Sequence, residues 1–236
     1  MYPETAVVDL NADLGEEVTE DAALLEIVSS ANVACGFHAG NEQVMREVCV
    51  RAAGLGVAIG AQVSYADREG FGRRPMEVPA EQLSAWVAEQ VAVLSAIALS
   101  AGTQVRYVKA HGALYNRIAD DAEQAAAVLA GSGGLPVLGL PGSRVLVLAE
   151  QAGRSAIGEG FPDRGYTAQG RLVPRDQPGA LVAGSRAVAE HAVELAGRED
   201  VRTVCVHGDS ADAVQTARAV RAALLAAGFD VRPWSV

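Results

Sequence analysis

Residues 9–16, with the sequence DLNADLGE, decide the fold class because polar and apolar side chains alternate along them. Successive residues of a β-strand point to opposite faces, so the polar residues share one face and the apolar residues the other. The two sets are Asp9, Asn11 and Asp13, and Leu10, Ala12 and Leu14. Strands of a parallel sheet are normally apolar on both faces. A polar face therefore indicates a strand that lines a cavity.

The same alternation recurs in five further strand patterns, with the polar residues crowded toward the C-terminal end of each. These residues are Asn32 and His38 on the second strand, Gln62 and Ser64 on the third, Lys109 and His111 on the fourth, Glu159 on the sixth, and His207 and Asp209 on the seventh. α/β folds bind their ligands at the C-terminal ends of the strands. We therefore expect a ligand site at that end.

Short strand patterns alternate with longer helical patterns along the whole chain. The strand patterns cover residues 6–13, 30–38, 57–64, 105–111, 136–140, 155–161 and 203–209, and the helical patterns cover 19–29, 42–54, 80–101, 121–131, 143–152, 179–196 and 210–227. Thr19, Asn41 and Ser210 are plausible helix N-caps. Such βα units require a parallel sheet, either closed or open and doubly wound. A closed barrel gathers the polar side chains on one axis, so we predict an α/β fold with a seven-stranded parallel β/α barrel.

Two long segments without a regular pattern, residues 65–78 and 161–179, each follow a strand and are rich in Gly, Pro and Arg. Loops of this length in a compact domain are usually functional. We expect both loops to border the mouth of the cavity, with Arg68, Arg73 and Arg74 near the opening.

Composition limits the class of protein. Half of the 236 residues are hydrophobic and no linker interrupts the chain, so we expect a single domain over residues 1–236. The formal net charge of −10 disfavours nucleic acid and anionic membranes as partners. The three cysteines lack CxxC spacing, and no targeting or membrane-spanning segment is recognised, so we expect a cytoplasmic protein.

Lysine and histidine usage points to the candidate site. Lys109 is the one lysine beside eighteen arginines, and it lies on the inward face two residues before His111. Its compact, flexible ammonium group predicts a catalytic or anion-binding role. His38, His111 and His207 end inward-facing strands, whereas His191 falls in mid-helix and is interpreted as structural.

The acidic residues of the first strand divide into two groups. Asp9 and Asn11 lie deeper and are expected to form a buried hydrogen-bond network, whereas Asp13 lies where a general base or a ligand would. Asp13, His38 and His111 together could bind a divalent metal, but the chain lacks HxxxH and HxH spacing, so the metal requirement stays unknown. Without a GxxxxGK[ST] motif, a helix-opening GxGxxG or a GxSxG, the standard P-loop, dinucleotide and serine-hydrolase interpretations lack support.

Seven blocks are spread along nearly the whole chain: DLNADLGE (9–16), SSANVACGFHAGN (29–41), GAQVSYADREGFGRR (60–74), KAHGALYN (109–116), EGFPDRGY (159–166), RLVPRDQPGA (171–180) and CVHGD (205–209). In order and spacing they resemble the signature blocks of the LamB/YcsF family. Ala12, Ala110 and Pro162 depart from the usual Cys, Pro and Ala of that family, and none of them is a charged position.

The resemblance implies an irregular seven-stranded β/α barrel, TIM-barrel-like and similar to glycoside hydrolase and deacetylase barrels. It also implies hydrolysis of 5-oxoproline to L-glutamate coupled to ATP hydrolysis, in an assembly with two further subunits, B and C. Mg²⁺ would accompany the nucleotide.

The resemblance and the lined cavity together suggest which residues act. The catalytic set would be Asp13, His38, Lys109, His111 and His207, and the set that binds substrate or ATP would be Asn11, Glu16, Gln62, Glu159, Asp163, Arg164 and Asp209. Lys109 and Arg164 would bind anions, Asp13 would act as base or magnesium partner, and the histidines would transfer or orient protons. Two alternatives stay open: a metal-dependent amidase or deacetylase that acts alone, and a binding protein without catalytic activity within the assembly.

Overall fold

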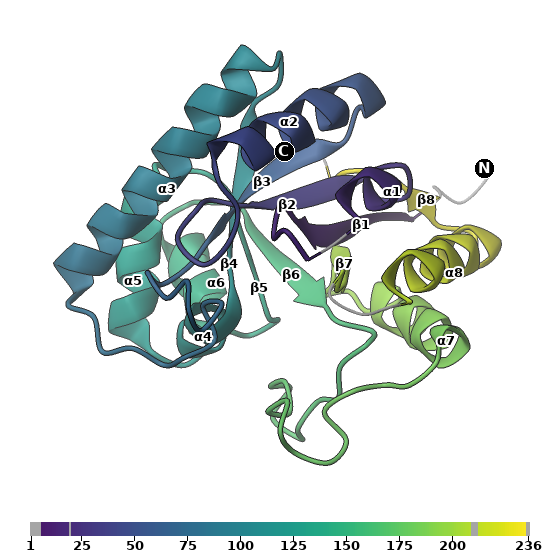
Figure 1. The fold of residues 1–236 in the computed structure, drawn as a ribbon. Helices are drawn as coiled ribbons and strands as arrows, with labels where there is room; N and C mark the ends of the chain where they lie inside the picture. The colour runs from purple at the N-terminus through teal and green to yellow at the C-terminus, as the bar shows by residue number, and fades with distance from the viewer. Residues whose placement is uncertain (1–5, 19, 209–211, 235–236) are drawn as a thin grey trace.

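The computed structural model describes residues 6–18, 20–208 and 212–234. Seven parallel strands of this part close into a barrel, because β1 pairs with both β2 and β7 (Figure 1). In barrel order they are β1 (Val7–Leu14), β2 (Ser30–Ala34), β3 (Ala58–Val63), β4 (Val105–Ala110), β5 (Val137–Gly139), β6 (Ala156–Gly160) and β7 (Thr203–Val206). The predicted seven-stranded parallel barrel is confirmed, and each predicted strand overlaps an observed one.

The barrel is irregular and carries one strand outside its closure. β5 has three residues, and β6 and β7 share two register positions. β8 (Asp230–Val231) pairs with Val7 and Val8 at the start of β1. It was not predicted, since two residues are too few to form a pattern.

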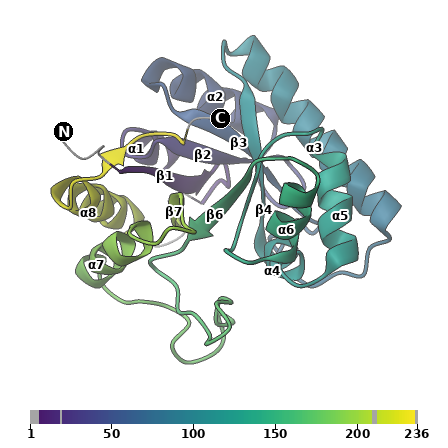
Figure 2. The same cartoon turned by 180° about the vertical axis from the view of Figure 1, so that it is seen from behind.

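Helices connect the strands and cover the outside of the barrel (Figures 1 and 2). They are α1 (Asp21–Leu25), α2 (Glu42–Leu55), α3 (Ala80–Ser100), α4 (Gly112–Arg117), α5 (Ala122–Gly131), α6 (Arg144–Gln151), α7 (Ser185–Ala196) and α8 (Ala213–Ala226). Each predicted helical range contains one of these helices or overlaps it, but α4 has no predicted counterpart. Its six residues make less than two turns, too few for a helical period to show in the sequence.

The helix ends have local causes. Asn41 caps α2 as predicted, because its Oδ1 accepts hydrogen bonds from the backbone N–H groups of Gln43 and Val44 at 3.0 and 3.1 Å. The predicted caps Thr19 and Ser210 lie outside the described residues. α7 begins later than predicted, at Ser185, because Gly184 before it has a φ of 86°, which is not helical.

The core lies between the barrel and the helices. The outward residues of β1 are buried in one apolar cluster with helix residues such as Leu24 and Val48. α3 is long and apolar enough to cross a membrane by length and composition. In the structure it packs on α5 and on strands β3 and β4, through residues that include Leu83, Val87 and Leu94. Packing in this layer accounts for part of its apolar composition, since 33% of the apolar stretch is buried.

The inward face of β1 begins with a hydrogen-bond network deep in the barrel. Ser29 and Ser30 each donate to Asp9 Oδ1 at 2.7 Å, and Thr203 donates to Oδ2 at 2.6 Å. Asn11 Nδ2 donates in turn to Thr203 Oγ1 at 2.7 Å. Burial raises the pKa of Asp9 to about 6 although the three hydroxyl hydrogen bonds oppose the rise.

Asp9 should therefore make folding stability depend on pH. Its pKa is higher in the folded than in the unfolded chain, so between about pH 4 and pH 6 the folded state keeps a proton that the unfolded state loses. Its contribution to the free energy of unfolding is full below this window and falls as the pH rises through it, by up to about 3 kcal/mol.

The measurement is urea unfolding of the wild type and Asp9→Asn at pH values from 4 to 7. The stability advantage of the wild type should shrink across the window and then level off. Asp176→Asn, at an exposed position, is the control and should show no such trend. A constant difference between wild type and Asp9→Asn from pH 4 to 7 would contradict the raised pKa.

Candidate active site

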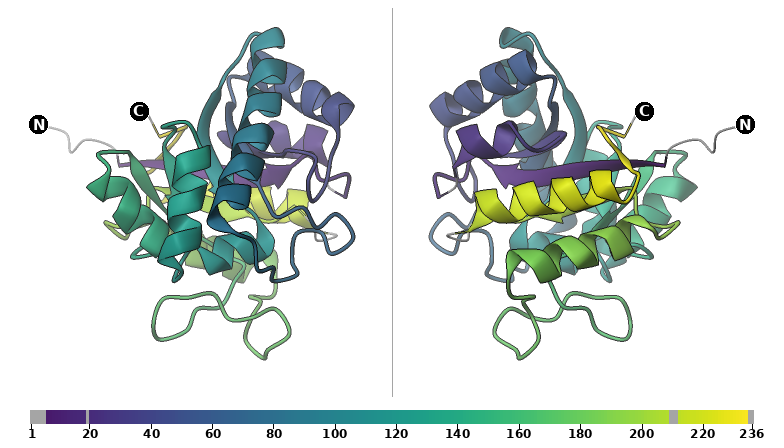
Figure 3. Two further views of the ribbon diagram at one scale, coloured as in Figure 1. Left: turned by 90° about the vertical axis from the view of Figure 1, so that its left-hand side faces the viewer. Right: turned by 90° about the vertical axis from the view of Figure 1, so that its right-hand side faces the viewer.

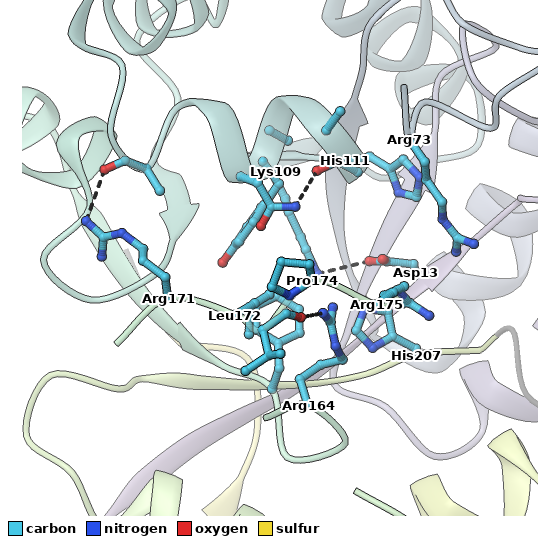
Figure 4. A pocket seen from close by; sticks show the side chains of 18 of the residues that line it. Asp13, Arg73, Lys109, His111, Arg164, Arg171, Leu172, Pro174, Arg175 and His207 are labelled. Atoms are coloured by element: carbon cyan, nitrogen blue, oxygen red, sulfur yellow. Dashed lines mark hydrogen bonds and ion pairs between the residues drawn. The ribbon is translucent and has the colours of Figure 1, made fainter. Parts of the chain in front are cut away.

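A cavity of about 480 Å³ opens at the C-terminal end of the barrel lumen (Figure 4). Its size is within the roughly 300–1,000 Å³ of small-molecule sites. The polar and aromatic residues of its wall include Asp13, Glu16, Arg73, Lys109, His111, Tyr115, Phe161, Arg164, Arg171, Arg175 and His207. They come from the ends of β1, β4, β6 and β7 and from both long loops, which places those loops at the mouth as expected.

Lys109 forms the buried centre of the charged groups. Its side chain is 2% exposed, and its Nζ lies 3.0 Å from Asp13 Oδ1 and 2.8 Å from Glu159 Oε1. It also donates to Cys205 Sγ at 3.1 Å. The ammonium group thus has two carboxylates of the chain as partners. The predicted anion-binding role of Lys109 stays a prediction.

The charges of this group stabilise one another. Burial alone would raise the pKa of Asp13, but Lys109, followed by His207 and His111, holds that pKa far below its usual range. Burial would lower the pKa of Lys109, and Asp13, Cys205 and Glu159 instead raise it well above its ordinary value. Asp13 is therefore an ionised carboxylate at neutral pH, and so low a pKa makes it a poor general base.

Glu16, His38 and His111 form a second cluster beside Asp13. His111 Nε2 donates to the carbonyl of Phe71 at 3.0 Å, which leaves Nδ1 as an acceptor for Gln62 Nε2 at 3.0 Å. The His38 ring stacks on the His111 ring with 4.1 Å between centroids. Burial, and after it the His38 ring, holds the pKa of His111 well below its usual range, so His111 is neutral.

This second cluster differs from the predicted metal trio. Glu16, His38 and His111 each offer one ligand atom, and the three atoms lie within 4.8 Å of one another. Asp13 Oδ1 is instead held by Lys109 and by Asn32 Nδ2, the latter at 2.9 Å. Glu16 thus takes the place expected of Asp13.

His207 faces the cavity from the opposite side and pairs with Asp163. The distance from His207 Nδ1 to Asp163 Oδ2 is 2.6 Å, and the ring stacks on Phe161. Burial lowers the pKa of His207, but the Asp163 carboxylate outweighs it and the net shift is upward. Burial likewise raises the pKa of Asp163, and His207 reverses that shift. The pair can hold and deliver a proton near neutral pH.

Three arginines of the two long loops, Arg73, Arg171 and Arg175, surround the mouth and are called the rim arginines below. Arg73 comes from residues 65–78, and Arg171 and Arg175 come from the loop that projects from the barrel after β6 (Figure 3). Arg171 pairs with Asp120 at 2.8 Å.

Some expected positions need correction. Arg164 lines the cavity, but its guanidinium group donates to the carbonyls of Val173 at 2.7 Å and Ala180 at 3.1 Å. It therefore holds the second long loop together. The predicted anion contact of Arg164 stays a prediction.

The first loop also differs in part from expectation. Arg68 binds Glu17 and the carbonyls of Gly36 and Gly40. Arg74 pairs with Asp67 and Glu69. Neither of these two arginines lines the cavity, because each is held by groups outside it.

The predicted site residues fall into three groups. Those at the cavity wall are Asp13, Glu16, Lys109, His111, Arg164 and His207, and those behind the wall are Asn11, His38, Gln62, Glu159 and Asp163. Asp209 lies outside the described residues. The sequence pattern did not indicate five further residues of the site: Tyr115, Phe161, Arg171, Arg175 and Cys205. Cys205 and His207 are two residues apart on one strand, so the alternation already placed Cys205 on the inward face. Arg171 and Arg175 lie in a loop, where side chains follow no regular alternation.

The chain is similar over nearly its whole length to known proteins. The profile of the LamB/YcsF family matches residues 8–236. The chain is 52% identical over 246 residues to a 5-oxoprolinase subunit, designated A, from Streptomyces avermitilis, covering 95% of this chain and 98% of the relative. The lactam utilization protein from Thermus thermophilus superposes with a TM-score of 0.88 at 37% identity, over 97% of this chain and all of that one.

More distant structures share the fold alone. The catalytic domain of a peptidoglycan N-acetylglucosamine deacetylase from Eubacterium rectale has a TM-score of 0.57 and 10% identity, over the whole of this chain and 91% of that one.

The Lys109 ion pairs lead to a stability prediction. Lys109→Met removes the ammonium group and leaves Asp13 and Glu159 as buried, unpaired carboxylates, so the free energy of unfolding at pH 7 should fall by about 3–5 kcal/mol. Glu159→Gln in the Lys109→Met background should recover part of this loss, because it removes one of the two charges. Urea unfolding of both single variants and the double variant measures the coupling. A loss below about 1 kcal/mol in Lys109→Met would mean that solvent or other groups compensate the carboxylates.

Proposed function

The chain belongs to the LamB/YcsF family, and on this basis we propose that it opens 5-oxo-L-proline to L-glutamate in a reaction coupled to ATP hydrolysis. We further propose that it works in an assembly with two partners, subunits B and C. The observation that carries the proposal within the structure is the small cavity that His207, paired with Asp163, and the rim arginines face together.

The shape and charge of the cavity suit this substrate. 5-Oxoproline is a five-membered lactam with one carboxylate, so it needs a small pocket with a cation at one side. Arg73 and Arg175 line the mouth of a chain that is otherwise acidic overall, and they supply that cation. Phe161, Leu172 and Pro174 provide apolar wall for the ring methylenes.

Ring opening needs activation of the amide and protonation of its nitrogen. Transfer of the γ-phosphoryl group of ATP to the lactam oxygen makes the ring carbon electrophilic. Water adds to that carbon, and the carbon–nitrogen bond breaks as the nitrogen takes a proton and leaves as the amine. A second water then cleaves the resulting acyl phosphate to the side-chain carboxylate of glutamate and phosphate.

The residues divide this work by their charge states. Asp163 favours the protonated form of His207 and binds its Nδ1, so Nε2 is the nitrogen that gives its proton to the leaving amine. Asp13, kept ionised by Lys109, stabilises the protonated His207. In this proposal Asp13 acts through its charge and does not serve as the general base. The rim arginines would neutralise the phosphate oxygens, and Mg²⁺ would enter with the nucleotide.

One observation favours a second candidate function, a metal-dependent amidase that acts alone. Glu16, His38 and His111 have the residue types of a metal site, and deacetylases share the fold. This candidate would release product without ATP and without the two partners.

The test is an assay of glutamate release from 5-oxoproline by the chain alone and with both partners, with and without ATP. Release should require ATP and the partners. His207→Gln in the full assembly should lower kcat by about 10²- to 10⁴-fold, the usual contribution of a general acid. His191→Gln is the matched control and should keep normal activity, since His191 lies on α7 and does not line the cavity. Release without ATP would support the amidase, and full activity of His207→Gln would refute its assigned role.

Asp163 should act through His207, as a positioning residue. Asp163→Asn removes the carboxylate that raises the pKa of His207, so that pKa should fall. As the pH rises, His207 then loses its proton at a lower pH than in the wild type. The basic limb of the kcat profile should therefore move to lower pH. Asp200→Asn, which removes an exposed carboxylate paired with Arg198, is the control. An unchanged basic limb in Asp163→Asn would show that His207 is not the acid.

A further inference from the structure

Two buried histidines and one glutamate meet where β1, β2 and β4 end. Glu16 follows β1, His38 follows β2, and His111 follows β4, while Gln62 on the intervening β3 lies between them. We propose that Glu16, His38 and His111 bind one divalent transition-metal ion of the Zn²⁺ class at the floor of the cavity. The proposal concerns ion binding by the chain itself and does not rest on the proposed function.

The spacing of the ligand atoms fits such an ion. Glu16 Oε1 lies 3.4 Å from His111 Nδ1 and 3.7 Å from His38 Nε2. Ligands about 2.0–2.1 Å from a tetrahedral ion are separated by roughly 3.3–3.4 Å. The two distances from Glu16 Oε1 therefore exceed this spacing by at most a few tenths of an ångström, and all three ligand atoms lie within 4.8 Å of one another.

One hydrogen bond beside the cluster leaves the His111 Nδ1 lone pair on the side of Glu16 and Gln62. His111 Nε2 donates to the Phe71 carbonyl, which fixes the tautomer and turns the Nδ1 lone pair toward Glu16. A histidine that binds a metal through one nitrogen commonly donates the other N–H to a backbone carbonyl in this way. Phe71 has a φ of 55°, which is unusual for a residue with a side chain. A strained backbone therefore holds this carbonyl against His111.

Unsatisfied polar atoms give independent support. Among the described residues neither ring nitrogen of His38 has a hydrogen-bond partner, and the residue is 1% exposed. Leaving a buried polar group unpaired is costly, and a metal ion would satisfy Nε2. Gln62 Oε1 is likewise buried without a partner in this part of the chain. Rotation of its carboxamide would bring that oxygen to the position of Nε2, beside Glu16 and His111, as a fourth ligand.

The donor set selects the class of ion. Two imidazole nitrogens and one carboxylate oxygen suit Zn²⁺ and similar first-row ions, whereas Mg²⁺ and Ca²⁺ prefer oxygen ligands. Glu16 and His111 line the cavity, so a coordination position would face it. An open position of this kind distinguishes a site that takes a further ligand from a closed structural site.

The test is a Zn²⁺ titration of the full chain after removal of metal by a chelator, read by calorimetry and by elemental analysis of the dialysed protein. One Zn²⁺ should bind per chain and raise Tm, and Mg²⁺ at equal concentration should not replace it. His38→Gln and Glu16→Gln should each weaken binding by more than about 100-fold, since even partners behind the ligands typically contribute 10- to 100-fold. His191→Gln is the matched control and should bind like the wild type.

Circular dichroism of each variant shows whether it is folded, and His111→Gln provides a third ligand variant should one of them unfold. Absence of one-to-one binding by the wild type would overturn the proposal. Wild-type affinity in the folded His38→Gln and His111→Gln variants would overturn it as well. Because no substrate or ATP is present, the result is separate from the assay of 5-oxoproline hydrolysis, and either proposal can fail while the other stands.

Discussion

The ion pairs of Lys109 with Asp13 and Glu159 lie in the middle of the barrel lumen, and the arrangement of the site depends on them. A buried ammonium group is stable only when carboxylates surround it, and the reverse holds for each carboxylate. Lys109 on β4 thus ties together β1 and β6 across the lumen. It also keeps Asp13 ionised next to the cavity, where its negative charge reaches both His111 and His207. Removal of the Lys109 ammonium group would favour the protonated forms of Asp13 and Glu159.

On two sides of that centre, the pKa values of two histidines are shifted in opposite directions. On one side burial and the stacked His38 ring keep His111 neutral and able to offer a lone pair. On the other side Asp163 favours the protonated form of His207. Titratable groups whose environments push their pKa values apart are typical of sites that need both a proton donor and an unprotonated partner. Within one small cavity, His111 can therefore offer a lone pair, whereas His207 can donate a proton.

Much of this could be predicted from alternation along the strands. Side chains alternate between the two faces of a strand. Because Leu10 and Leu14 are buried on the outer face of β1, Asp9, Asn11 and Asp13 must face the lumen. The alternation did not predict which side chains contact one another. That Lys109 is compensated by Glu159, or that Arg164 holds backbone carbonyls, depends on strands and loops far apart in the sequence. Glu16 is a related case. It lies past the end of β1, after Gly15 with a φ of 74°, so the alternation no longer indicates where its side chain points.

The proposed function requires the polar C-terminal end of the lumen to bind 5-oxoproline. A crystal structure of the chain grown with 5-oxoproline tests it most directly. We expect the ligand in the cavity between Arg73 and His207, with its carboxylate toward Arg73 and Arg175 and its ring nitrogen within about 3 Å of His207 Nε2. A ligand bound on another surface, or a cavity filled only by solvent at a saturating ligand concentration, would contradict it.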